Sequence, residues 1–282
     1  MQVKIQDALA ETAILIASRR QTANLKGLAA EEKLWLYLST LSYFVSVTGQ
    51  VYRFEDALEE MGDVAQRHVS ARMSAHKNTY AQQTVELLLN TLSETPSPEQ
   101  QHVLVLVALI NFIADTGQVD EVEDFFNHLL DLAPVAVAHF TRHEEAEAWL
   151  KGSAEPPSPA RILIGDEYYQ FWYEREDNTR GMYRDYPIEP AMEALTARGI
   201  PSQRPSFATR AEAEAWLMSH PANPYSFVAI AGEHYFAVHH PRLKRHSLHH
   251  VASALNAWEE RKKAVEREAA LEAAPRSDGT RE

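Results

Sequence analysis

The 282-residue sequence contains no cysteine. This absence excludes disulfide-stapled secreted domains, cysteine-ligated zinc or iron–sulfur sites, and thiol nucleophiles. Positive charge is also scarce, because 27 Lys and Arg residues stand against 40 Asp and Glu residues, for a net charge of −13. A chain this acidic is not built over its whole surface for nucleic acid or anionic lipid.

Long apolar runs are missing as well. The most apolar stretch, residues 103–114, is shorter than the roughly 20 residues that a membrane-spanning helix needs. Polar side chains interrupt residues 1–20, so we predict no secretory signal and a cytoplasmic location without membrane contact. The sequence also lacks a P-loop and the GxGxxG, GxSxG and HExxH motifs, and we expect no cofactor and no catalytic residue.

The remaining composition is that of a folded protein, with 45% apolar and 24% charged residues. The length favours two domains. Residues 1–134 show helical periodicity and predict an all-α domain, whereas residues 135–274 mix helix and strand patterns. Residues 275–282 are polar and predict a flexible tail.

The first part contains a duplication, in which residues 31–56 align without a gap onto residues 99–124. Eleven of these 26 positions are identical. Both copies have an apolar helix pattern, the sequence Thr-Gly-Gln-Val and an acidic start to a second helix. Gly49 and Gly117 fit the left-handed position that ends a helix, so we predict two αα-hairpin corners rather than ligand-binding loops.

The second part contains another duplication, in which residues 140–169 align onto residues 207–236 with ten of 30 positions identical. Each copy predicts a strand, a short helix containing Glu-Ala-Glu-Ala-Trp-Leu or its close variant, a proline-rich link and a hairpin, which together form a βαββ unit. Gly165-Asp166 and Gly232-Glu233 are the predicted two-residue hairpin turns.

A helix is predicted over residues 189–198, between the two units, and a long one over residues 248–273. The predicted fold class is therefore α+β. An N-terminal all-α domain of duplicated αα-hairpins precedes a tandem βαββ domain and a long C-terminal helix.

Acidic residues gather on the two short helices and at the hairpin tips. An acidic surface of this kind speeds the encounter with a basic protein partner. The predicted contact residues are Glu144, Glu145, Glu147, Asp166, Glu167, Glu212, Glu214 and Glu233. None of these carboxylates pairs as a catalytic dyad would, since residues two apart on a helix point to different faces and turn tips are solvated.

Histidines are concentrated in residues 239–250, which hold five of the 13. If Leu248 lies in a helix, His246, His249 and His250 stand at spacings that place imidazoles on one metal ion. No carboxylate lies in the segment to orient them, and three basic residues oppose a cation there. We favour a polar, partly basic surface and keep a metal site as an alternative.

The same end of the chain carries the one local excess of positive charge. Residues 239–270 contain seven basic and four acidic residues, and the basic side chains that would contact nucleic acid are Arg242, Lys244, Arg245, Arg261, Lys262 and Lys263. Four aromatic residues look exposed and suit stacking on bases, namely Tyr168, Trp172, Tyr183 and Tyr186. No RNA-binding signature accompanies them.

The pattern F-x(4)-EAEAWL, followed by proline and G-x-x-Y, resembles repeats of uncharacterised proteins from predatory, social bacteria of the myxobacterial type. Some of those proteins are similar to cytoplasmic immunity or inhibitor proteins that accompany toxins and secreted proteases. The resemblance covers residues 140–169 and 207–236, about a fifth of the chain, and carries no catalytic residue.

Three functions remain open from the sequence. The favoured one is a non-enzymatic protein that binds one protein partner, a toxin or a secreted enzyme, and neutralises it. The second is a nucleic-acid-binding regulator that uses the basic C-terminal segment. The third is a metal-dependent enzyme centred on residues 239–250.

Overall fold

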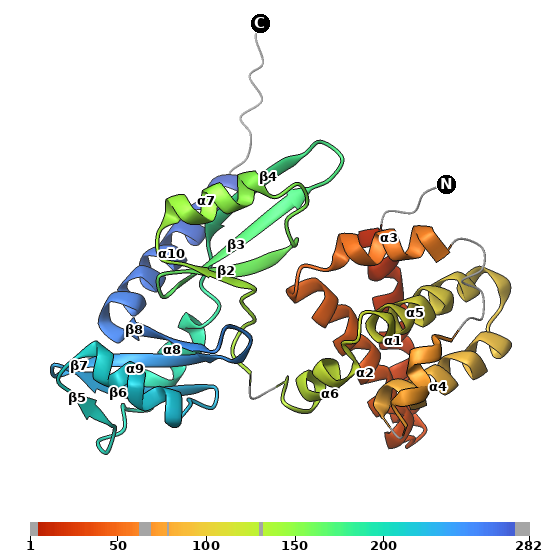
Figure 1. Ribbon diagram of the computed structural model, residues 1–282, viewed down its shortest axis with the longest axis horizontal. Helices are drawn as coiled ribbons and strands as arrows, with labels where there is room; N and C mark the ends of the chain where they lie inside the picture. The colour runs from red at the N-terminus through yellow and green to blue at the C-terminus, as the bar shows by residue number, and fades with distance from the viewer. Residues whose placement is uncertain (1–4, 62–68, 78, 130–131, 274–282) are drawn as a thin grey trace, which may run out of the picture.

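The structure is a computed structural model that describes residues 5–61, 69–77, 79–129 and 132–273. The predicted tail, residues 275–282, lies outside the described residues. Helices occupy the first part of the chain, and two four-stranded sheets and a last helix follow (Figure 1). The α+β class predicted from the sequence is confirmed.

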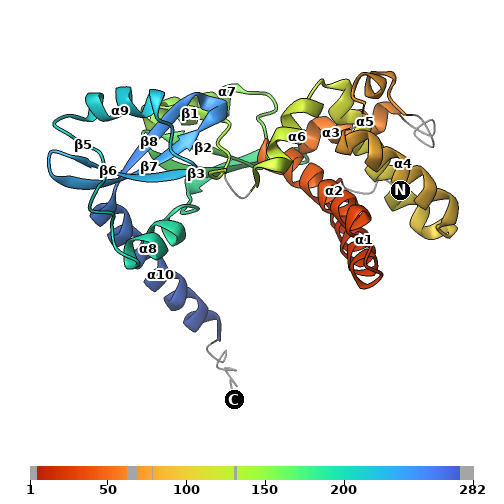
Figure 2. The same cartoon turned by 90° about the horizontal axis from the view of Figure 1, so that it is seen from below.

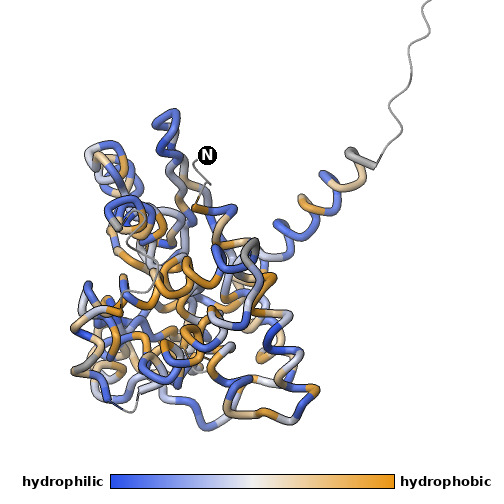
Figure 3. The backbone as a smooth tube through the Cα atoms, turned by 90° about the vertical axis from the view of Figure 1, so that its right-hand side faces the viewer, coloured by the Kyte–Doolittle hydropathy of each residue, from blue (hydrophilic) through white to orange (hydrophobic). Residues whose placement is uncertain are grey.

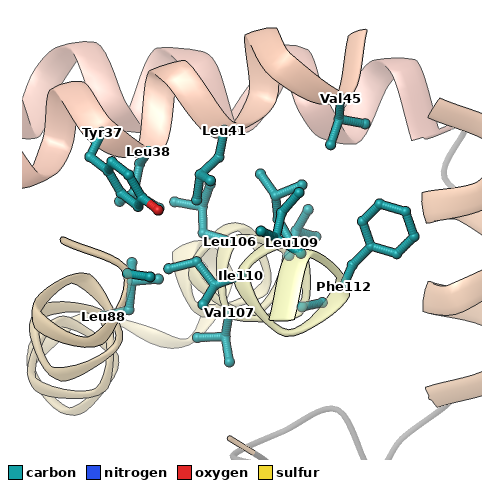
Figure 4. Close-up of a cluster of buried hydrophobic side chains, with 14 of the residues drawn as sticks. Tyr37, Leu38, Leu41, Val45, Leu88, Leu106, Val107, Leu109, Ile110 and Phe112 are labelled. Carbon is teal, nitrogen blue, oxygen red and sulfur yellow. The ribbon is translucent and has the colours of Figure 1, made fainter. Parts of the chain in front are cut away.

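The N-terminal part consists of helices joined by short corners. Their bounds are α1 (Ile5–Leu25), α2 (Ala29–Val47), α3 (Val51–Met61), η2 (Ala71–Ala75), α4 (Tyr80–Glu94), α5 (Ser97–Asp115) and α6 (Val119–Asn127). α5 lies at the centre, and its buried side chains include Val103, Leu106 and Ile110. Figure 4 shows side chains of α5 packing against those of α2 and Leu88 of α4.

These helices form two similar units, α1–α3 and α4–α6. α1 packs on α5 while α4 packs on α2, and α2 packs on α6 while α5 packs on α3. The side-chain amides of Gln50 and Gln118, which are equivalent positions of the duplication, exchange two hydrogen bonds of 3.0 and 2.8 Å. This reciprocal pattern is that of a two-fold rotation between the two units.

Both predicted corners are present. Gly49 and Gly117 have positive φ values of 68° and 71°, which glycine adopts at the end of a helix without the strain that a Cβ brings. The N–H of each donates to a helix carbonyl three residues earlier at 3.0 Å. The hydroxyls of Thr48 and Thr116 close the same turns by donating to the carbonyls four residues earlier.

The C-terminal part contains two units of the same topology. The first consists of β1 (Ala138–Phe140), α7 (His143–Gly152), β2 (Ala160–Ile164), β3 (Glu167–Glu174) and β4 (Thr179–Arg184). The second consists of β5 (Ser206–Phe207), α9 (Arg210–Ser219), β6 (Tyr225–Ile230), β7 (Glu233–His240) and β8 (Arg245–His250). α8 (Glu189–Ala197) joins the units, η4 (Pro241–Leu243) links β7 to β8, and α10 (Val251–Ala273) ends the described chain.

Each unit therefore has one more strand than predicted, and the topology is βαβββ. The strand orders are β1-β2-β3-β4 and β5-β6-β7-β8, with the first pair of each sheet parallel and the other pairs antiparallel. The missed strands are β4 and β8, and the expected long helix starts three residues later than predicted because residues 248–250 belong to β8.

The second hairpin turn also differs from the prediction. Ile164 pairs with Glu167, which leaves Gly165-Asp166 as the first turn, as expected. In the second unit, however, Ile230 pairs with Glu233, so the turn is Ala231-Gly232, with both residues at positive φ. The second unit is one residue shorter between its helix and its hairpin, which a gapless alignment cannot represent.

The C-terminal part is layered. α7 and α9 lie on one side of the two sheets, and α8 and α10 lie on the other (Figure 2). Leu163 and Tyr168 of the first sheet share a buried cluster with Phe236 of the second, Met192 of α8 and Val251 of α10. The far half of α10 projects away from the body (Figure 3).

The corner at Gly49 joins the two parts of the molecule. The carbonyl of Gly49 accepts a hydrogen bond from the N–H of Ser158 at 3.1 Å. A Cβ added at Gly49 would lie 2.5 Å from the Cβ of Pro157, so the two backbones approach as closely as glycine permits. At Gly117 a Cβ would meet no described atom within 4 Å.

A second contact follows on α3. The hydroxyl of Tyr52 donates to the carbonyl of Tyr173 at 3.1 Å, and the guanidinium of Arg175 lies 4.6 Å from the Tyr52 ring centre. Arg175 also forms a two-pronged ion pair with Asp56, at 2.7 and 3.1 Å. These contacts fix the first sheet against the helical part.

Candidate functional site: the open face of the first sheet

The predicted contact acids of α7 bind neighbours on their own helix. Glu145 accepts hydrogen bonds from the Arg142 side chain at 3.0 Å and from the N–H of Thr141 at 3.1 Å, which lower its pKa. Glu147 pairs with Lys151 at 3.2 Å, and this contact lowers its pKa as well. Glu144 is exposed in the first turn of the helix.

The acids of α9 have the same kind of role. Glu212 completes a capping box with Thr209, in which each side chain bonds the other's backbone N–H. Glu214 pairs with Arg210 at 2.7 Å. These two carboxylates stabilise the start of their helix, so the charge that they offer to a partner is already compensated locally.

The acids expected at the hairpin tips lie in three different settings. Asp166 is not solvated as predicted, because its side chain is 16% exposed and accepts from Arg210 at 2.7 Å and from Arg245 at 3.3 Å. The tip of the first hairpin thus packs against α9 and β8 of the second unit. Glu167 pairs with Arg184 at 2.7 Å, and Glu233, the first residue of β7, lies 3.5 Å from His250.

The histidines of residues 239–250 lie on strands, not on a helix. β8 holds His246, His249 and His250, so the helical spacing that would have brought their imidazoles together does not apply. In the described part of the chain, no group of three or more His, Asp or Glu side chains has the arrangement of a metal site.

Three of these histidines are buried, and two of them form a short hydrogen-bonded chain. The Ser247 hydroxyl lies 2.8 Å from Nε2 of both His240 and His249. Burial lowers the pKa of His240 and of His249 to about 3, and that of His246 to about 4. Neutral imidazoles suit this chain, because the hydroxyl needs one donor and one acceptor around it. Ser247 is fully buried, so the chain links strands rather than presenting a nucleophile.

The predicted basic segment is dispersed over the molecule. Arg242 pairs with Glu121 of α6 at 2.7 Å, and Arg245 with Asp166. Lys262 lies between Glu193 and Glu259, and Lys263 pairs with Glu260. Lys244 stands at a left-handed position after η4. Arg261 is exposed on α10 and, among the described side chains, has no ion-pair partner. No continuous basic track results.

The aromatic residues singled out in the sequence differ in exposure, because Tyr168 is buried, Tyr186 is half-buried, and Trp172 and Tyr183 are exposed. Tyr168 is 2% exposed and donates to the carbonyl of Pro134 at 3.0 Å, so it is a core residue and not a stacking platform. Trp172 and Tyr183 are 42% and 56% exposed. Both lie on the face of the first sheet that is opposite α7.

This open face is defined by Gln170, Trp172, Gly181 and Tyr183. The strand register sets Gln170 opposite Tyr183 and Trp172 opposite Gly181, so the four side-chain positions form two adjacent rows. The Trp172 indole lies directly on Gly181, where a Cβ would be 2.7 Å from its Nε1 atom. Because residue 181 has no side chain, the half-exposed indole packs directly on its backbone, and this contact fixes the position of the indole.

A groove of about 480 Å³ continues the open face along α10. On the strand side it is lined by Tyr183 and Tyr186, and on the helix side by Trp258, Arg261 and Val265. Tyr186 and Trp258 have ring centres 6.0 Å apart, and the Trp258 indole N–H donates to Glu193 at 2.9 Å. Both walls are therefore held in place by contacts within the molecule. We call this the α10 groove.

A second groove, of about 220 Å³, lies where the two sheets meet the helical part. It is lined by the half-exposed Tyr43 of α2, together with Arg161 and Tyr225. Eight large apolar or aromatic side chains are exposed in the described chain. Trp172, Tyr183 and Val265 are three of them, and all three lie on the open face or in the α10 groove.

A cleft of about 260 Å³ between the two parts of the molecule shares five lining residues with the 220 Å³ groove, namely Phe125, Leu132, Ala133, Pro134 and Val135. Phe44 and Phe125 of the helical part form one wall, and His239, His240 and Arg242 form part of the other. The Arg242–Glu121 ion pair bridges it. One cation and one anion of its walls are therefore already paired with each other.

Within the described ranges, no single helix has the length and apolar character of a membrane span; α5 and α6 meet that test only as a pair bent by 110°. No protein-family model, no curated protein and no solved structure matches this chain.

Proposed function

We propose that this chain is a non-enzymatic protein that binds one protein partner on the open face of its first sheet and thereby blocks that partner. The observation that carries the proposal is the position of Trp172 and Tyr183 on neighbouring strands of one sheet face. Both are half-exposed and lie side by side on the part of the sheet face that α8 and α10 leave open, and Tyr183 also lines the α10 groove.

The residue types support a protein partner. Trp, Tyr and Arg are the side chains that most often dominate the binding energy of protein interfaces. Trp172 is fixed against Gly181 before any partner arrives, so little side-chain entropy remains to be lost on binding. The surrounding ion pairs are satisfied within the chain and provide a polar rim.

The net charge of −13 has a second role in this proposal. The acids of α7 and α9 are compensated at short range, but the summed field of the molecule still attracts a basic protein over longer distances. We therefore assign the acidic residues to the rate of encounter and the aromatic residues to the stability of the complex.

The other two hypotheses have less support. Lys262 and Lys263 are paired with glutamates, so the aromatic face lacks the uncompensated cations that nucleic acid needs. The His240–Ser247–His249 chain is buried, and no carboxylate hydrogen-bonds to it among the described side chains. We assign no catalytic role to it.

The proposal is tested by capture from native cytosol with three forms of the full chain. Wild type is expected to retain one protein in stoichiometric amount. Trp172→Ala/Tyr183→Ala is expected to lose it, since truncating one interface hot spot weakens binding by about thirtyfold or more.

Met218→Ala is the matched control, because Met218 is 63% exposed on α9, on the other side of the sheets. This variant should capture as wild type does. Capture of no stoichiometric protein by wild type, or equal capture by the double variant, would contradict the proposal.

A further inference from the structure

The first sheet ends in a long edge strand without a neighbour. In the described chain β4 is the last strand of its sheet and no segment pairs with its outer side. The other outer strands are protected in other ways. β1 and β5 have only three and two residues, and four of the six residues of β8 are buried. Edge strands are usually protected against added strands by being short, covered or charged. β4 is neither short nor covered, and its charged side chains are Arg180 and Arg184.

The register identifies which backbone groups of β4 are free. The N–H of Asp185 donates to the carbonyl of Tyr168 at 3.0 Å, which marks that pair as hydrogen-bonded. Because the hydrogen-bonding direction alternates along an antiparallel strand, Gly181 and Tyr183 also face β3. The N–H and C=O groups of Arg180, Met182 and Arg184 therefore point outward.

The α10 groove lies at the end of this free edge. Tyr183 and Arg184 belong both to β4 and to the groove, and Trp258, Arg261 and Val265 of α10 form the opposite wall. An extended segment that continues the hydrogen-bonding of β4 thus passes directly into an aromatic groove. Among the described side chains Arg261 has no ion-pair partner there, and the acids of the lining are Asp185, which pairs with Arg161, and Glu266.

We propose that the partner binds by adding an extended segment to the outer edge of β4, with one apolar side chain in the α10 groove and one carboxylate on Arg261. This inference rests on the proposed function and specifies how the partner binds. Backbone hydrogen bonds to Arg180, Met182 and Arg184 would supply affinity, and the groove would supply specificity.

A second copy of this chain is a poorer occupant of the edge. Two β4 strands in antiparallel pairing would set Arg180 and Arg184 of one copy close to the same cations of the other. A peptide that carries a carboxylate complements the positive charge of this edge. Basic regions elsewhere on the same partner would be attracted by the net negative charge of the chain at longer range.

The probe for the test is a phage-displayed library of random twelve-residue peptides, selected on the full-length chain. We expect the selected peptides to alternate apolar and polar residues and to contain Asp or Glu. Bound as synthetic peptides, they should slow hydrogen exchange at the amides of Arg180, Met182 and Arg184 by at least tenfold. Exchange at Gly181 and Tyr183 should change little, because those amides already donate hydrogen bonds to β3.

Two pairs of variants separate the edge from the groove. Met182→Pro removes one outward N–H and should weaken peptide binding at least thirtyfold, whereas Met182→Ala, which loses the same side-chain packing, should weaken it less than threefold. Arg261→Gln should weaken binding about tenfold and reduce its salt dependence, whereas Lys263→Gln, whose lysine is paired with Glu260, should not.

The outcomes are distinguishable from those of the capture experiment. Peptides that bind without protecting the three outward amides, or equal binding by Met182→Pro and Met182→Ala, would overturn the strand-addition inference. A partner captured through Trp172 would still leave the proposed function standing. Sedimentation of the free chain as a dimer that Met182→Pro dissociates, or tight binding of mixed oligonucleotides lost in Arg261→Gln, would overturn the choice of a peptide occupant.

Discussion

The two βαβββ units share one topology and differ in how they use the last strand. In the second unit, β8 is enclosed between α9 and α10 and against the first hairpin, and four of its six residues are buried. In the first unit no residue of β4 is buried. A duplicated backbone thus provides two equivalent strands, and the side chains around them decide which one completes the core and which one stays available for binding.

The same divergence separates the two corners of the helical part. Gly49 contacts Pro157 of the C-terminal part, whereas at Gly117 no described atom lies within 4 Å of the position that a Cβ would take. In the helical duplication, the Gly49 corner contacts the C-terminal part and the Gly117 corner is exposed. In the second duplication, β8 is buried in the core and β4 is not.

The largest expected effect tests the difference between β8 and β4. Leu248→Ala removes a side chain that is 3% exposed and should lower the free energy of unfolding by about 2–5 kcal/mol. Tyr183→Ala, at 56% exposure, should lower it by less than about 1 kcal/mol. Urea unfolding measures both. Similar losses in the two variants would mean that β4 is as enclosed as β8.

A smaller effect is expected at the corners. Both Gly49→Ala and Gly117→Ala place a Cβ at positive φ, which costs about 1 kcal/mol. Gly49→Ala must also move Pro157, which adds roughly 1–3 kcal/mol. The difference in free energy of unfolding between the two variants, from thermal or urea unfolding, therefore measures how tightly Gly49 packs against Pro157. Equal losses in the two variants would show that Pro157 moves away from an added Cβ without destabilising the protein.

The smallest expected effect is the loss in free energy of unfolding per unit decrease in pH. The folded-state pKa of His240 and His249 is about 3, below the value of about 6.5 in an unfolded chain. The unfolded state then binds more protons below pH 6.5, so the free energy of unfolding falls as the pH falls, by up to about 1.4 kcal/mol per pH unit for each histidine.

His249→Gln keeps a hydrogen-bonding side chain beside Ser247 and removes the contribution of one histidine whose pKa burial lowers. Between pH 6.5 and 5, the variant should lose less stability per pH unit than wild type. His128→Gln is the control, because that histidine is exposed on the helical part. An unchanged pH slope in His249→Gln would show that this imidazole titrates freely in the folded chain.

Much of the fold could be predicted from the sequence because both duplications repeat strong local signals. Gly49, Gly117 and the Glu-Ala-Glu-Ala-Trp-Leu helices have definite local geometries. β4 and β8 were missed because their segments, Thr-Arg-Gly-Met-Tyr-Arg and Arg-His-Ser-Leu-His-His, lack alternating apolar residues. In β8 the buried positions include two histidines that form hydrogen bonds, His246 with the N–H of Ala222 and His249 with Ser247, in place of the usual apolar side chains.

The candidate site was only partly predictable. Trp172, Tyr183 and Tyr186 were recognised as aromatic residues suited to binding, but their neighbours Trp258 and Arg261 come from a helix more than 70 residues away in the chain. The acids at the predicted contacts could not be excluded from sequence, because partners such as Arg210 and Arg245 of Asp166 lie in the other unit. Local patterns carry no information on such pairings.

The Gln50–Gln118 amide pair has a further consequence. A residue that bonds its own counterpart across a rotation axis is what an isologous interface between identical subunits contains. The helical part thus has the architecture of a homodimer whose subunits have been fused into one polypeptide. In one polypeptide the two halves can differ in sequence and in contacts, and here the corner at Gly49 contacts Pro157 while Gly117 is exposed to solvent.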